Sequence, residues 1–69
     1  MDEKIEKFNG KLLTPQEAGD YLGIKLSKVY QMCMKREIPF VKIGRLNRFR
    51  RQDLDKWIES HIQGANDVH

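Results

Sequence analysis

The residues best suited to chemistry in this chain lie on one side of a predicted helix between Leu22 and Lys35. With ~100° between successive residues, the apolar side chains of this stretch gather on one face. They are Leu26, Val29, Met32 and Cys33. The opposite arc carries hydroxyl, amide and ammonium groups but no carboxylate: Ser27, Lys28, Gln31 and Lys35. Gln pairs well with the major-groove edge of adenine, and Lys with that of guanine. We therefore predict that this arc reads base edges in DNA, with Lys28 and Gln31 as the main contacts.

Positive charge is concentrated in the middle of the chain. Nine of the 13 Lys and Arg residues lie between Lys25 and Arg51, together with a single acid, Glu37. The other nine acids lie outside this segment, so the net charge of +3 conceals a basic pole and an acidic pole. A basic pole attracts polyanions, whereas an ordinary solvated surface mixes both signs. Phosphate contacts, which position a duplex without reading its sequence, are expected from Lys25, Tyr30, Lys42, Arg45, Asn47, Arg48, Arg50 and Arg51.

A strong helix-start signal precedes this segment. Thr14 suits the N-cap, Pro15 suits the first helical position, and Glu17 three residues after Thr14 can close a capping box. The helix should end at Gly23. Its free N–H groups could also seat a phosphate beside Gln16, although capping alone explains the motif.

A second helix should begin within about three residues of Gly23 and end near Arg36–Glu37, because Pro39 disfavours helical geometry in the residue before it. Two short helices joined by a tight turn that contains Gly form a helix-turn-helix unit. As a lone signal this is weak, because any helical hairpin gives it. The basic arc on the second helix is what points to DNA.

From Phe40 to Arg50 the apolar residues no longer follow helical spacing but alternate with polar ones. This pattern predicts a β-hairpin around a turn at Gly44–Asn47. Alternation places these side chains toward the core: Val41, Ile43 and Phe49. It places these on the opposite face: Lys42, Arg48 and Arg50. Charge can simply protect an edge strand. Five basic positions without an acid, counting Arg45 and Arg51, favour a wing that contacts DNA.

A last helix is predicted from Gln52 to about Ser60, with Leu54, Trp57 and Ile58 on its apolar face. Trp57 is therefore expected to pack rather than to stack on bases. The carboxylates of this helix form a solvated face and imply no acid–base pair. Cys33 is expected to be a small buried hydrophobe.

The bulk properties allow one small domain, which we place at 11–61 between a lead-in at 1–10 and a tail at 62–69. A chain this short has little spare length for an enzyme pocket. One Cys and two His without partners at ligand spacing argue against a disulfide, a metal site or a cofactor. The chain lacks an apolar run for a membrane span and a signal peptide at its start, which favours the cytoplasm.

The order of these motifs resembles the excisionase-type, MerR-like winged helix-turn-helix DNA-binding domains. The similarity spans Leu12 to Ser60 and rests on several segments in register: Leu12–Ala18, Tyr21–Ile24, Val29–Tyr30, Ile38–Arg45, Arg48–Arg51 and Asp53–Ile58. It implies an α+β, mostly helical fold made of a two-helix unit, a hairpin wing and a C-terminal helix. It also implies that the second helix enters the major groove of double-stranded DNA and that the wing lies on the backbone or an adjacent minor groove.

Three positions depart from the family pattern: Lys25 stands where a Ser often caps the recognition helix, Arg36 where a Gly usually ends it, and Asn47 where the wing often has an aromatic. Members of the family act as recombination directionality factors or small transcription regulators, and these two roles stay open. An integrase or recombinase, or further copies of the chain on adjacent sites, would be the protein partners. A protein–protein adaptor with an acidic partner is the alternative function. RNA binding is less favoured, because the basic pole lacks interleaved aromatics.

Overall fold

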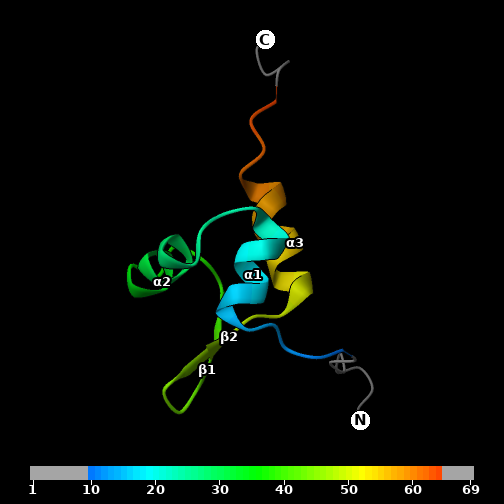
Figure 1. Ribbon diagram of the computed structural model, residues 1–69. Helices are drawn as coiled ribbons and strands as arrows, with labels where there is room; N and C mark the ends of the chain where they lie inside the picture. The colour runs from blue at the N-terminus through cyan, green and yellow to red at the C-terminus, as the bar shows by residue number, and fades with distance from the viewer. Residues whose placement is uncertain (1–9, 65–69) are drawn as a thin grey trace.

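The computed structural model describes residues 10–64 as three helices and one antiparallel hairpin (Figure 1). The elements follow one another as α1 (Pro15–Leu22), α2 (Leu26–Met34), β1 (Val41–Ile43), β2 (Leu46–Arg48) and α3 (Arg51–Ser60). α1 packs against α2, a hydrogen bond between Tyr21 and Asp55 joins α1 to α3, and the hairpin projects away from the helices (Figure 1). This confirms the winged helix-turn-helix architecture. The predicted lead-in and tail fall mostly outside the described residues.

α1 begins and ends where its local signals predict. The Thr14 hydroxyl accepts the Glu17 N–H at 3.1 Å, and the Glu17 carboxylate accepts the Thr14 N–H at 2.9 Å, which completes the capping box. The Thr14 backbone hydrogen bond lowers the pKa of Glu17. Gly23 ends the helix in the left-handed region at φ 73°.

Close packing between α1 and α2 depends on Gly19. A Cβ at this position would lie 2.9 Å from the Ile24 carbonyl oxygen and 3.3 Å from a methyl group of Val29. The Gly19 carbonyl also accepts the Ile24 N–H at 2.9 Å, so the turn closes directly over the helix end. Only Gly lets the two helices approach this closely, which sets the position of α2 relative to the core.

The hairpin differs from the prediction in its turn and therefore in its faces. Val41 pairs with Arg48, Lys42 with Asn47 and Ile43 with Leu46, so only two residues form the turn. Gly44 has φ 61° at the first turn position, which a two-residue type II′ turn favours. Because paired residues share a face, the expected separation of Val41 from Arg48 was wrong. Placing Ile43 in the core was also wrong, since 49% of it is exposed.

The base of the hairpin is tied to the segment before α1. Phe49 and Leu13 form an isolated antiparallel bridge, with reciprocal N–H to carbonyl hydrogen bonds of 2.8 and 2.9 Å. Phe49 is fully buried. The wing therefore starts from the core itself.

A single core joins all the elements. It takes side chains from α1, α2, α3, the loop after α2 and the hairpin base: Leu13, Ala18, Val29, Met32, Cys33, Ile38, Phe49 and Leu54. Trp57 packs against this core and donates its indole N–H to the Glu37 carbonyl at 2.8 Å, as a packing residue should. No helix among residues 10–64 is long and apolar enough to cross a membrane.

Candidate nucleic-acid interface

The four residues predicted to read bases lie on the exposed side of α2, with Lys35 at its C-cap. Val29, Met32 and Cys33 are buried, which confirms the predicted apolar face. The four polar side chains are all exposed on the outward side of the helix: Ser27, Lys28, Gln31 and Lys35. The side of α2 that carries these exposed side chains is therefore open to a large partner.

The same side of α2 also carries Met34, which the sequence reasoning missed. Met34 is 80% exposed, and Tyr30, one turn before it, is 47% exposed. Met34 also lies three residues from Gln31, so the two side chains are neighbours on the helix surface. An apolar side chain beside an amide can contact a thymine methyl group while the amide reads an adjacent base. In the sequence, the only signal for Met34 is its position at the edge of the polar arc, next to Ser27.

The N-terminus of α2 lacks a side-chain cap. Lys25 occupies the N-cap position with extended backbone (φ −72°, ψ 150°), and its side chain makes no capping hydrogen bond. The first N–H groups of a helix have no partner inside it and form the positive end of its dipole. An ammonium group adds to that positive field instead of balancing it. This end of α2 is therefore suited to a phosphate.

The C-terminus of α2 closes with a Schellman motif in which Arg36 takes the left-handed position. The Arg36 N–H donates to the Cys33 carbonyl at 3.0 Å, and the Glu37 N–H donates to the Met32 carbonyl at 2.8 Å. Arg36 has φ 56°. The helix ends at Met34, slightly earlier than predicted, because this motif turns the chain before Pro39 is reached.

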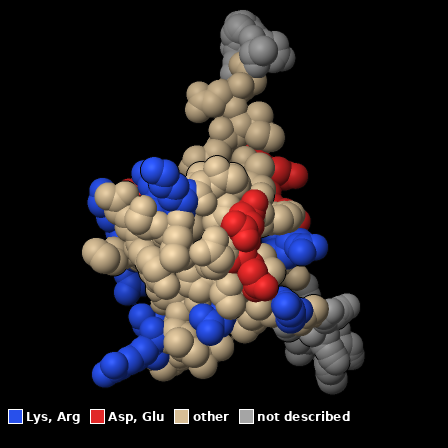
Figure 2. Space-filling view, viewed as in Figure 1, with Lys and Arg blue, Asp and Glu red and all other residues tan. Residues whose placement is uncertain are grey.

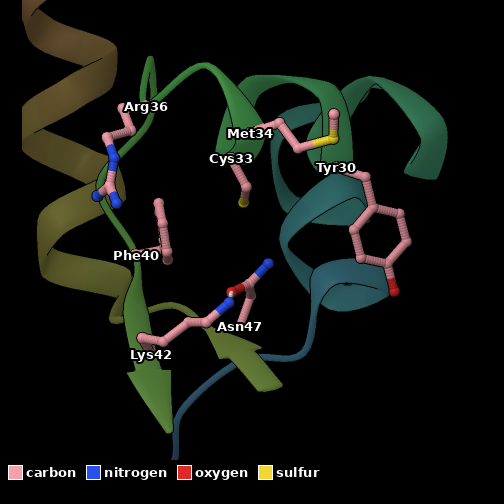
Figure 3. A pocket seen from close by; sticks show the side chains of 7 residues that line it. All are labelled: Tyr30, Cys33, Met34, Arg36, Phe40, Lys42 and Asn47. Atoms are coloured by element: carbon pink, nitrogen blue, oxygen red, sulfur yellow. Dashed lines mark hydrogen bonds between the residues drawn. The ribbon is translucent and has the colours of Figure 1, made fainter. Parts of the chain in front are cut away.

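A cleft lies between α2 and the hairpin (Figure 3). It has a volume of about 460 Å³ and is lined by Tyr30, Cys33, Met34, Arg36, Phe40, Lys42 and Asn47. In Figure 3 the Cys33 thiol points into it from α2, while Lys42 and Asn47 reach toward each other on the hairpin side. Cys33 is only 5% exposed, and its burial raises the pKa of the thiol. It is a buried apolar contact, as predicted.

Hydrogen bonds within the hairpin orient several of its polar side chains. The Lys42 ammonium donates to the Asn47 side-chain oxygen at 3.3 Å, across the strand pair. The Arg48 guanidinium donates to the Asn47 backbone carbonyl at 2.9 Å. Arg45 stands exposed in the turn. Each cation keeps further N–H donors for an anion.

Three residues expected at the backbone lie in other surroundings. Arg50 makes a two-pronged ion pair with Asp53, with both N–O distances 2.9 Å, and this hydrogen bonding lowers the pKa of Asp53. The Arg51 guanidinium lies 5.2 Å from the centre of the Tyr21 ring, on the α1–α3 side. The Gln16 amide donates to Asp20 at 3.3 Å within α1. A phosphate at Arg50 would have to compete with Asp53.

The described surface separates the two charge signs. Figure 2 shows most Lys and Arg side chains toward α2 and the hairpin, and most Asp and Glu side chains over α1 and α3. Tyr21 of α1 donates a hydrogen bond to Asp55 of α3, which raises the pKa of Tyr21. Within residues 10–64, no three His, Cys, Asp or Glu side chains converge as metal ligands would. The arrangement offers a cationic surface built on one helix and one hairpin.

Comparison with known proteins agrees with this geometry. The model of a family described as a helix-turn-helix domain matches residues 12–62. The chain belongs to the helix-turn-helix domain family. The match covers α1, α2, the hairpin and α3. Together with the relative described next, it confirms the resemblance to excisionase-type domains drawn from the sequence.

A protein named probable excisionase, from Saccharopolyspora erythraea, is 41% identical to the chain over 49 residues. The aligned segment is 71% of this chain and 50% of that relative, so the chain spans about half the length of the protein it matches. No solved structure matches the chain.

Proposed function

We propose that this helix-turn-helix domain binds double-stranded DNA, with α2 in the major groove and the hairpin on the backbone or the adjacent minor groove. The observation that carries the proposal is the cationic surface shared by α2 and the hairpin, on which the polar side of α2 has no carboxylate. An α-helix fits the width of the major groove. Most acidic side chains lie over α1 and α3 and would face away from the phosphates (Figure 2).

The roles follow from what each side chain offers. Base edges are read by the exposed residues of α2: Ser27, Lys28, Gln31 and Lys35. Phosphates are held by the cations at the start of α2 and on the hairpin: Lys25, Lys42, Arg45 and Arg48. Tyr30 and Asn47 line the cleft between α2 and the hairpin together with Lys42. The chain performs no catalytic step in this proposal.

The cellular role we infer is that of an excisionase-like recombination directionality factor or a small transcription regulator. The relative named probable excisionase supports the first of these. One recognition helix reads few base pairs, so several copies on adjacent sites, or an integrase bound beside them, would supply the affinity. The bacterial cytoplasm is the compartment that suits either role. A single one-to-one complex of nanomolar affinity on long DNA would contradict the need for several copies.

A salt titration on duplex DNA tests the proposal. Affinity for a random-sequence duplex is measured by fluorescence anisotropy at several salt concentrations, and four phosphate contacts predict a log–log slope of about −4. Arg48→Ala should weaken binding to all sequences alike and make the slope shallower by about one. Lys56→Ala removes the same charge from the exposed side of α3 and serves as the matched control, with an unchanged slope.

Absence of binding at low salt would refute DNA recognition. The cationic surface would then have to dock an acidic protein, which is the adaptor function considered above. A slope that Arg48→Ala and Lys56→Ala change equally would mean that net charge, rather than the hairpin, determines binding.

A further inference from the structure

The cleft between α2 and the hairpin combines an apolar floor with a cationic rim. Cys33 and Phe40 supply thiol and aromatic surface, and Tyr30 lies along the α2 side. Arg36 stands on one side of the opening and Lys42 on another, each carrying a positive charge. None of the residues that line the cleft is an acid. Its occupant should therefore be an anion that also presents apolar surface.

A deoxyribose with its phosphodiester has both properties. If α2 occupies the major groove and the hairpin reaches the adjacent minor groove, the strand that separates these grooves must pass between the two elements. The cleft lies at that place (Figure 3). We propose that the cleft holds one sugar–phosphate unit of this strand, with the sugar over the apolar floor and the phosphate between Arg36 and Lys42. This inference rests on the proposed DNA binding.

The backbone at Arg36 supports this assignment. A residue other than Gly at a left-handed position costs free energy, and Arg36 holds φ 56° at the position of the Schellman motif where Gly is usual. No ion pair of the Arg36 guanidinium with another of residues 10–64 offsets that cost. A guanidinium suits a phosphate because it can donate two parallel hydrogen bonds to the phosphate oxygens.

On the other side of the cleft, a hydrogen bond orients the Lys42 ammonium group. The Asn47 side-chain oxygen accepts one of its hydrogen bonds at 3.3 Å, which leaves two N–H donors of the ammonium group. An acidic peptide could meet the same two charges. The location between the two elements proposed to enter DNA grooves favours the nucleic-acid strand, because a docked duplex would cover the cleft.

The test replaces single phosphates in the DNA. A duplex that carries a selected site is prepared with one neutral methylphosphonate at each position in turn, and its binding to wild type and to Arg36→Asn is compared. Asn tolerates the left-handed region, so the variant removes the charge without adding backbone strain. At one or two phosphates on the strand between the grooves, we expect wild type to lose roughly tenfold in affinity. Arg36→Asn should bind the unmodified duplex more weakly than wild type by a similar factor. A methylphosphonate at those positions should then cause no further loss of its affinity.

Two controls define the outcome. Arg36→Lys keeps the charge and should retain most of the coupling, whereas Lys56→Asn removes a distant charge and should show the wild-type pattern at every phosphate. If every methylphosphonate weakens wild type and Arg36→Asn equally while both still bind, the cleft proposal is overturned and DNA binding stands. If wild type binds no duplex at any salt concentration, both fail together.

Discussion

Replacing Lys25 by Ser should make the domain more stable and its DNA binding weaker. The backbone at this N-cap already has the extended geometry that a capping Ser needs, and no side chain caps α2 at present. A serine cap is worth ~1 kcal/mol. Removing an ammonium group from the positive end of the helix dipole adds ~0.5 kcal/mol. The sum of ~1.5 kcal/mol corresponds to a rise of roughly 6–12 °C in Tm for a domain of this size.

DNA binding should change in the opposite direction. If Lys25 contacts a phosphate, its loss makes the slope of log affinity on log salt shallower by about 0.9. Thermal unfolding followed by circular dichroism measures the first effect, and anisotropy titration at several salt concentrations the second. Lys25→Ala is the matched control, because it removes the same charge without adding a hydroxyl. It should show the same change in slope with only the smaller dipole part of the gain in stability.

The gain in stability and the loss of DNA binding are tested separately. A Ser variant no more stable than the Ala variant would show that α2 has no need of a cap at this end. An unchanged slope in both variants would remove Lys25 from the phosphate contacts.

The remaining predictions concern base reading, packing and one ion pair. Gln31→Ala should cost ~1–3 kcal/mol at one base position and relax the choice there, which a binding selection on randomised sites would detect, whereas a uniform loss would remove Gln31 from base reading. Gly19→Ala should destabilise the domain by ~1–3 kcal/mol in urea unfolding, because its Cβ would lie 2.9 Å from the Ile24 carbonyl oxygen; an unchanged midpoint would contradict that contact. Asp53→Asn removes the carboxylate that pairs with the Arg50 guanidinium and should tighten DNA binding with a steeper salt slope, and no change would leave Arg50 without a phosphate role. The lowered pKa of Asp53 means that its ion pair stabilises the fold above the unfolded pKa of ~3.9 and is lost as pH falls through the lower, folded value. The loss of stability between pH 7 and pH 3 should therefore be smaller in Asp53→Asn than in wild type.

Helix α1 could be predicted from the sequence because its boundaries depend on nearby residues. Thr14, Pro15 and Glu17 form a capping box within one turn, and Gly23 supplies the left-handed residue that ends the helix. The buried side of α2 followed from periodicity in the same way. The close approach at Gly19 could not be predicted, because it depends on where α2 lies in space.

The hairpin faces were mispredicted because they depend on the length of the turn. A four-residue turn at Gly44–Asn47 was expected, but Gly44 allows a turn of two residues, and Asn47 then pairs with Lys42. This shift of register decides which side chains reach the cleft. Met34 and Arg36 were missed for a related reason: an exposed Met is unremarkable in a sequence, and the role of Arg36 becomes visible only when the hairpin lies opposite it.

The bridge between Leu13 and Phe49 divides the wing into an anchored base and a projecting tip. The base shares two backbone hydrogen bonds with the segment before α1 and a buried aromatic ring with the core. The tip beyond it, from Ile43 to Leu46, is mostly exposed. The base of the wing is thus fixed to the core, whereas its tip can bend without disturbing many core contacts. The width of the minor groove varies with DNA sequence. The stiffness of the hairpin tip would therefore set the range of minor-groove widths that the domain can bind.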